Sequence, residues 1–171
     1  MIITTDRYFQ ARLAGAKPLC LAYIGTNYGL RCFGKQMPTP EQVGTTLPNI
    51  IESGAYVLSF GEYRQAASQN SEDVTQALQE TVMDSCTLMF DNASGLFTEI
   101  ACREKFINGE LYLFQGFDYP GFIFSDFIRI FYGRIQTYKY GKLTFQCTAN
   151  QAVETDADTE GQTIDLTVTY T

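Results

Sequence analysis

The groups that could carry acid–base chemistry in this chain are carboxylates, because the sequence contains no histidine. A hydrolase triad therefore lacks its usual base, and nothing in the sequence places a serine–lysine or cysteine-based variant together. Two carboxylates could instead form a glycosidase site. The candidates are Asp84, Asp91, Glu99 and Asp118. Turn and surface roles explain each of them, so the sequence predicts no catalytic residue and a protein that is not an enzyme.

Potential cation ligands gather in residues 150–161, which we expect to form an acidic loop. Calcium-binding loops also place acidic residues at alternate positions, but here the glycine, Gly161, comes late and the twelve-residue pattern is missing. We favour a solvated loop, and a cation site is the alternative. The acidic residues concerned are Glu154, Asp156, Asp158 and Glu160.

The chain has five cysteines, an odd number, and they are widely spaced. No two of them form a C-x-x-C motif. This pattern disfavours a zinc or iron–sulfur site. Buried free cysteine behaves as a small apolar residue, so we expect free thiols, with no metal and no other cofactor. The cysteines are Cys20, Cys32, Cys86, Cys102 and Cys147.

Other residues with chemical potential have structural explanations. Phosphate-binding glycine loops need a strand, a glycine-rich loop and a helix in that order, whereas the glycines between residues 109 and 141 fall between strands. Arg129 and Arg134 lie in a predicted strand among aromatic residues. We expect them to make subunit contacts or ion pairs, since arginine favours half-buried contacts.

Length and composition indicate a single domain spanning residues 1–171. Charged residues are only 18% of the chain, while it contains 11 tyrosines and 13 phenylalanines, which suits a β-rich core or a contact surface. The net charge of −7 argues against nucleic-acid binding through a basic face. The sequence shows neither a signal-peptide pattern nor a run of ~18 apolar residues. We therefore expect a soluble protein, made in a reducing cytosol and not in a membrane.

The pattern of apolar residues and turn signals predicts a mainly β chain. Thr5 is expected to cap a short helix over 6–15, and Thr98 a second one over 99–105. Polar residues 61–74 are expected to form a loop or a flexible tongue, and 37–47 a loop. We expect strands within 18–35 (a hairpin), 55–60, 82–90, 110–115, 122–134, 142–148 and 164–169. About nine strands with two short flanking helices fit an antiparallel two-sheet sandwich or barrel.

The order of these elements carries a resemblance. An apolar strand enters an Asn-containing turn at residues 88–97, a short helix follows, and the strand 110–116 ends in a glycine. A strand reading aromatic–x–Gly–x–Ile comes next at residues 131–135, and then the strand 143–147. With the starting helix and the Pro-Leu-x-Leu strand at 18–21, the chain resembles the hub, distal tail and minor tail proteins of long-tailed bacteriophages. The resemblance covers most of residues 6–149.

The resemblance implies a tail-tube-like β domain that acts as a structural component of the virion. Copies of the chain would form a ring at the distal end of the phage tail, linking the tail tube to the tip or spike and lining the DNA channel. Six copies are favoured and three are the alternative; DNA would be passing cargo with no specific binding. The tail would be assembled in the host cytoplasm. Some minor tail proteins hold an iron–sulfur cluster in a cysteine-rich C-terminal part, which this chain lacks, so no cluster is carried over.

Two other functions compete with a virion ring component. The first is a soluble β-barrel that binds a small apolar ligand, and the second is an enzyme of unrecognised type. A ring former should run as a large oligomer, a ligand-binding barrel as a monomer, and an enzyme should lose activity on substitution of a named acid.

Overall fold

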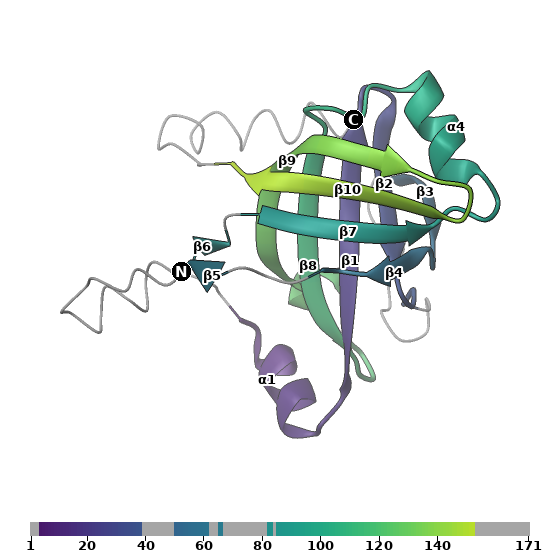
Figure 1. The fold of residues 1–171 in the computed structure, drawn as a ribbon. Coiled ribbons are helices and arrows are strands. Elements are labelled where there is room, and N and C mark those ends of the chain that lie inside the picture. Colours follow the sequence, from purple (N-terminus) through teal and green to yellow (C-terminus); the bar gives the residue numbers. More distant parts are fainter. Residues whose placement is uncertain (1–3, 39–49, 62–64, 67–81, 84, 153–171) are drawn as a thin grey trace.

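Eight strands form one strongly curled sheet, with the order β3-β2-β1-β8-β9-β10-β7-β4 (Figure 1). The structure is a computed structural model that describes residues 4–38, 50–61, 65–66, 82–83 and 85–152. The strands of this sheet are β1 (Lys17–Thr26), β2 (Gly29–Gly34), β3 (Ile50–Gly54), β4 (Val57–Ser59), β7 (Ser85–Asp91), β8 (Glu110–Asp118), β9 (Ile128–Tyr140) and β10 (Thr144–Gln151). The helices are α1 (Asp6–Leu13), α4 (Leu96–Arg103) and the short 3-10 helix η1 (Phe124–Asp126).

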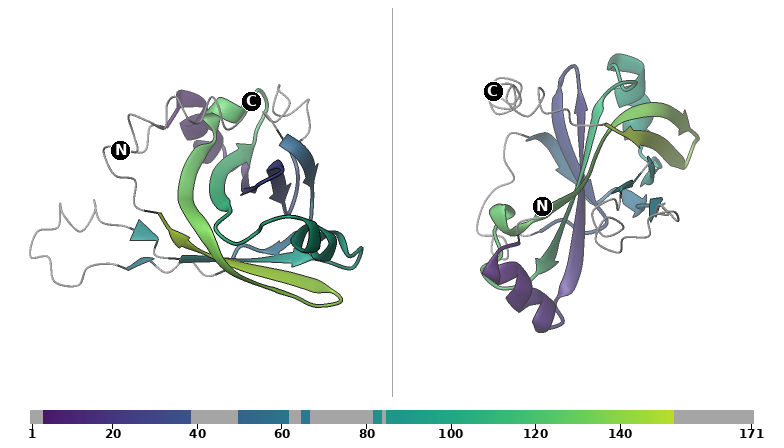
Figure 2. Two further views of the ribbon diagram at one scale, coloured as in Figure 1. Left: turned by 90° about the horizontal axis from the view of Figure 1, so that it is seen from above. Right: turned by 90° about the vertical axis from the view of Figure 1, so that its left-hand side faces the viewer.

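Strand β9 turns this single sheet into two layers, because it is long enough to belong to both. Its first part pairs with β8 and its last part pairs with β10. The half made of β10, β7 and β4 therefore lies across the half made of β1, β2 and β8 (Figures 1 and 2). The predicted mainly β class with flanking helices is confirmed. One strand pair departs from the antiparallel prediction: β3 runs parallel to β2.

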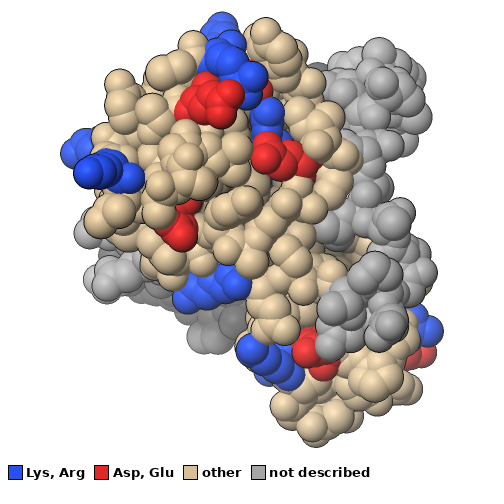
Figure 3. Space-filling model, turned by 90° about the vertical axis from the view of Figure 1, so that its right-hand side faces the viewer, with Lys and Arg blue, Asp and Glu red and all other residues tan. Residues whose placement is uncertain are grey.

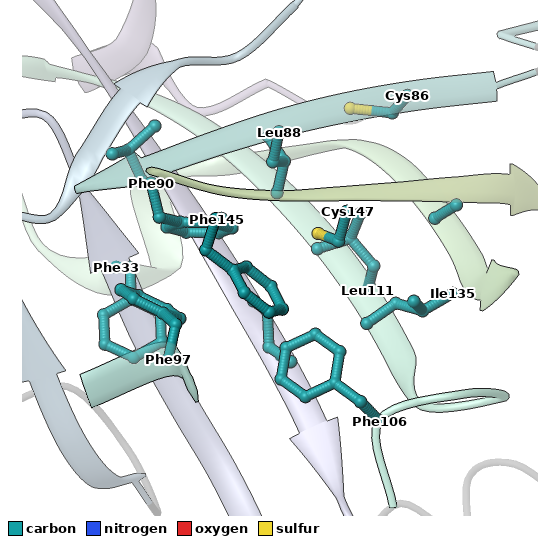
Figure 4. Packing of buried hydrophobic residues seen from close by; sticks show 14 of the residues in the cluster. Phe33, Cys86, Leu88, Phe90, Phe97, Phe106, Leu111, Ile135, Phe145 and Cys147 are labelled. Atoms are coloured by element: carbon teal, nitrogen blue, oxygen red, sulfur yellow. The ribbon is translucent and has the colours of Figure 1, made fainter. Parts of the chain in front are cut away.

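The space between the two halves is filled by an apolar cluster, which we call the interior cluster (Figure 4). Side chains alternate along a strand, so every second residue of β7, β8 and β10 points into this space. Helix α4 closes one side by inserting Phe97 and Ile100, both of which are fully buried. The ring of Phe97 stacks on those of Phe90 and Phe145, with centroid distances of 4.6 and 5.4 Å, and the latter two rings lie 6.2 Å apart, so the three rings form a compact triangle.

Helix α4 begins earlier than the sequence predicts, and a different residue caps it. The helix starts at Leu96, and the backbone N–H groups of Phe97 and Thr98 donate to the side-chain oxygen of Asn92 at 3.0 and 3.3 Å. The expected capping role of Thr98 is wrong, since Thr98 lies inside the first turn and accepts a hydrogen bond from the Asn92 amide. The same amide donates to the carbonyl of Gly141, so one buried side chain joins α4 to the β9–β10 hairpin.

The outer face of β1 and β8 carries a second apolar cluster, covered by α1 and residues 119–128. Thr5 caps α1 as predicted, accepting a hydrogen bond from the N–H of Tyr8 at 3.2 Å. The carboxylate of Asp126 then ties this helix to the β8–β9 connection, because it accepts hydrogen bonds from Thr5 and Arg7. The strand predicted over 122–134 is shifted: it begins only at Ile128, since its first residues form η1.

The strand predicted over residues 55–60 contains β4 alone, and β3 lies just before it in residues for which no strand was predicted. The chain leaves β3 at Gly54 and enters β4 at Val57. These two strands lie at opposite ends of the strand order, so the two residues between them cross from one half of the sheet to the other. Periodicity does not reveal β3, because only its first two residues, Ile50 and Ile51, are apolar.

A two-stranded ribbon extends from the start of β7, made of β5 (Gln65–Ala66) and β6 (Val82–Met83). In Figures 1 and 2 this ribbon lies beside the main sheet rather than within it. Most of the predicted loop 61–74, most of the loop 37–47, the closing strand 164–169 and nearly all of the acidic loop 150–161 lie outside the described residues.

The stacked position of Phe97 generates a test of the interior cluster. Phe97→Ala should lower the free energy of unfolding by about 3 to 5 kcal/mol, because the buried ring is lost and a cavity remains. Phe9→Ala is the matched control, since the Phe9 side chain on α1 is 50% exposed and should matter little. Urea unfolding followed by tyrosine fluorescence gives both values. Equal losses in the two variants would contradict the assignment of Phe97 to the centre of the core.

Candidate functional site

Two of the three buried charged residues of the described structure, Arg31 on β2 and Glu104, form one cluster. The Arg31 guanidinium makes a two-pronged contact with the carboxylate of Glu104, the residue that follows α4, with both N–O distances 2.6 Å. Glu52 on β3 accepts a third hydrogen bond at 3.1 Å, and the hydroxyl of Thr26 on β1 donates to Glu104. We call these residues the Arg31 cluster. It holds the end of α4 against three strands.

Both charges of the central pair are held in their ionised forms. Burial by itself raises the pKa of the Glu104 carboxyl, but hydrogen bonds from Arg31 and Thr26 outweigh it, so this pKa lies below its usual value. Burial lowers the pKa of Arg31, but the hydrogen bonds to Glu104 and Glu52 raise it further than burial lowers it. A carboxylate kept ionised and fully hydrogen-bonded is a poor proton donor or acceptor, so Glu104 is not suited to acid–base catalysis. We therefore assign the Arg31–Glu104 ion pair a structural role.

A cleft of about 370 Å³ opens beside the Arg31 cluster, between the β1–β2 turn and the start of β8. It exposes both signs of charge, from Lys105, Glu110 and Arg134. The Glu110 carboxylate accepts a hydrogen bond from Tyr112 and lies 3.8 Å from the Arg134 guanidinium, whose other nitrogen donates to the carbonyl of Asn108. Glu110 and Arg134 thus already interact within the chain. The cleft holds no pair of carboxylates and no nucleophile next to a base among its described lining residues.

The three described acidic residues considered for catalysis each have a separate local environment. Asp91 accepts a hydrogen bond from the N–H of Ala93 in the turn before α4. Glu99 lies on the exposed side of α4 and pairs with Arg103 at 3.3 Å. Asp118 ends β8 opposite Lys17, while Asp84 lies outside the described residues. The structure thus gives no support to a two-carboxylate site built from these residues.

The two predicted strand arginines differ in surroundings. Arg134 pairs with Glu110, as expected for an ion-pairing residue. Arg129 places its guanidinium 5.7 Å from the centre of the Tyr132 ring, a cation–π geometry. Whether either of them also contacts another subunit stays a prediction.

All five cysteines are free thiols. Burial raises the pKa of the Cys32 and Cys86 thiols to about 12 and that of Cys147 further. Such thiols are poor nucleophiles, because the thiolate is the reactive form. Within the described part of the chain, no three histidine, cysteine or acidic side chains gather as metal ligands would. The acidic residues 154, 156, 158 and 160 lie outside it.

The sequence favours an open β architecture with strand edges to be covered, but it does not identify the two edge strands. β3 and β4 end the strand order, and no other described strand pairs with their outer sides. Each carries a large apolar side chain that is about half exposed, Ile51 (56%) on β3 and Leu58 (48%) on β4. In the sequence, the one feature that could have indicated these edges is that Ile51 and Leu58 lie close to long polar segments. No helix in the described part of the chain is long and apolar enough to cross a membrane.

The buried ion pair generates a stability test with a pH dependence. Glu104→Gln should lower the free energy of unfolding by about 3 kcal/mol at pH 7, because it leaves the Arg31 charge buried with a weakened partner. The folded-state pKa of Glu104 is lowered, so its contribution is present above the usual pKa and is lost as pH falls through the folded-state value. The difference from the unsubstituted protein should therefore shrink toward acid pH.

Glu99→Gln is the matched control for this test. The Glu99 carboxylate makes an exposed i,i+4 pair with Arg103 on the same helix, which stabilises little. Urea unfolding at pH 7 and at acid pH gives the comparison. A loss of stability for Glu104→Gln that stays the same at both pH values would contradict the ion-pair account.

The thiols give a second test. A thiol titration of denatured, unreduced protein should count five, and a count of three or one would reveal disulfides. In the native protein, Cys102 should react first because it is the exposed thiol on α4, while Cys32, Cys86 and Cys147 should be protected. Alkylation followed by peptide mass spectrometry reads out each cysteine separately.

Comparison of the chain with protein-family models, with curated proteins and with solved structures finds no match.

Proposed function

We propose that the protein is a structural ring component of a phage tail, of the hub, distal tail or minor tail kind. Copies join into a ring that links the tail tube to the tip or spike and surrounds the DNA channel. The observation that carries the proposal is the pair of open, apolar sheet edges at β3 and β4. The proposal also draws on the resemblance of the chain to tail proteins in the order of its elements.

Open edges of this kind favour assembly. An unpaired strand presents a row of N–H and C=O groups to any other chain, and proteins usually protect such edges with charges, prolines or covering elements. In β3 and β4 the exposed positions are Ile51, Ser53 and Leu58, and the only charge on these strands, Glu52, is paired with Arg31. A chain with two different edges can join head to tail, and such contacts generate a closed ring when the rotation between copies closes.

The remaining exposed surface is consistent with this proposal. Figure 3 shows one face on which uncharged side chains predominate and charged ones are few and scattered. The tip of the β9–β10 hairpin exposes Tyr140 and Leu143, and the β5–β6 ribbon projects from the start of β7. The apolar tip of the β9–β10 hairpin is suited to reach a neighbouring subunit, since aromatic and apolar side chains dominate the centres of interfaces.

The excess of acidic residues in the chain suits a negatively charged channel wall, which would keep passing DNA from adhering. The described residues do not supply this negative charge. The described residues hold eleven of the 12 basic residues but only eight of the 19 acidic ones. The described part therefore has an excess of three positive charges, although the chain carries −7. A channel that repels DNA would draw its charge mainly from the residues outside the described part, which include the acidic residues 154–160.

The assembly state tests the proposal. Light scattering should give a mass of about 115 kDa for a ring of six copies, six times the 19.2 kDa of the chain. Three copies would indicate a position next to a trimeric spike. Class averages in electron micrographs, viewed down the ring axis, should show the same symmetry. A stable monomer at high concentration, with no ring in the presence of tail tube or tip proteins, would remove the proposal and favour the ligand-binding barrel.

Edge variants test which surface makes the ring. Ile51→Lys and Leu58→Lys each place a charge on an open edge, and each should reduce the mass toward that of a monomer. Leu13→Lys is the matched control, because Leu13 is 88% exposed on α1, which is not part of the sheet. A ring that survives both edge substitutions but not the α1 substitution would show that the edges are not the contact.

A further inference from the structure

A second cleft, of about 410 Å³, lies between the start of β1 and the residues that follow β4. Its apolar walls include Leu19 and Cys20 of β1, Phe60 after β4 and Ile130 of β9. Two lysines also line it, Lys17 at the start of β1 and Lys35 just after β2. We call it the β1–β4 cleft. It is separate from the cleft beside the Arg31 cluster, with which it shares no lining residue.

The apolar wall of this cleft continues the interior cluster. Cys20 lies on the same face of β1 as Ala22 and Ile24, two members of that cluster, because side chains alternate along a strand. Phe60 packs against the interior cluster from the β4 side, and Ile130 does so from β9. A ligand in the cleft would therefore contact the apolar interior of the sheet, at the end of β1 far from Thr26 and α4.

The charge lining the cleft has one sign. Lys17 and Lys35 supply two ammonium groups, and no aspartate or glutamate is among the described lining residues. The Lys17 ammonium donates to the side-chain oxygen of Gln36 at 2.6 Å, which holds it at the rim. Asp118 is opposite Lys17 in the β1–β8 pairing but does not line the cleft. An anion at the rim meets positive charge with no described carboxylate to repel it.

We propose that the β1–β4 cleft binds a small amphipathic anion, namely an unbranched acyl chain that ends in a carboxylate. The chain lies on the apolar wall and the carboxylate lies between Lys17 and Lys35. The volume is within the range of sites for small molecules. The mouths of curled sheets and barrels are common positions for such sites. This proposal is independent of the ring function.

The distribution of polar groups selects this class of ligand. Each methylene moved from water to an apolar wall contributes about 0.8 kcal/mol, so an acyl chain gains from Cys20, Phe60 and Ile130. A ligand with amides along its length would have to bury groups with few partners on that wall, which is unfavourable. A lysine ammonium is a compact point charge that suits a single carboxylate at an exposed rim.

The experiment uses the full-length protein and three ten-carbon probes with the same chain: decanoate, decanol and decyltrimethylammonium. Cys20 lies in the cleft and Cys102 lies exposed on α4, so the two thiols form an internal comparison. Saturating decanoate should slow alkylation of Cys20 at least fivefold and leave Cys102 unchanged. Decanol should protect Cys20 much less at equal concentration, and decyltrimethylammonium should not protect it.

Variants and chain length locate the two ends of the ligand. Lys17→Gln and Lys35→Gln should each weaken decanoate about threefold in calorimetric titration, since exposed charge pairs are modest. Lys139→Gln, on exposed β9 outside the cleft, is the matched control. Ile130→Glu should abolish protection, because it puts a negative charge on the apolar wall. From octanoate to decanoate the affinity should rise roughly tenfold, from two more buried methylenes.

Four outcomes would overturn the proposal. Decanoate could fail to protect Cys20, or it could slow Cys20 and Cys102 equally, which would mean surface adsorption. Equal protection by all three probes would show an apolar site without charge selection. Because Lys17 and Lys35 are exposed, their glutamine variants should fold, and unchanged decanoate affinity in both would remove the lysines from the site.

Discussion

The stacking of Phe97 on Phe90 and Phe145 is the contact on which the arrangement of this fold depends. A sheet bent into two crossed halves encloses a space that the strand side chains alone do not fill. Helix α4 fills it, and Phe97 is its deepest residue. The position of α4 then places Glu104, just after the helix, against Arg31 on β2. Loss of the aromatic stack would therefore loosen the buried ion pair, because both rely on the same helix.

Features that are encoded locally could be predicted from the sequence, and α1 illustrates why. Thr5 contacts an N–H only three residues away, so its capping role is visible in a short stretch of residues. The β1–β2 hairpin and the Asn108 turn before β8 are local in the same sense. The mainly β class followed from these signals together with the alternation in β7 and β10.

The features that could not be predicted depend on residues far apart in the chain. Asn92 caps α4 from a turn and at the same time holds Gly141, 49 positions further on. Arg31 and Glu104 are 73 positions apart, and β2 contains no acidic residue that could have pointed to a partner for Arg31. The crossing between β3 and β4 depends on how far the sheet curls. Without the tertiary structure, Thr98 was the better local candidate for a cap, and β3 was not predicted as a strand.

The open edges and the β1–β4 cleft share one short segment of chain. Leu58 lies exposed on β4, and Phe60, two residues later, lines the cleft. A neighbouring subunit that pairs with the outer side of β4 would lie next to the cleft. If that neighbour changes the affinity of the cleft for an anion, the anion must change the affinity of the neighbour by the same factor, because binding free energies at two sites are reciprocal. If the neighbouring subunit covers Phe60, it blocks the cleft and the two binding events oppose each other. If it holds Phe60 in place at the wall of the cleft, each binding event strengthens the other.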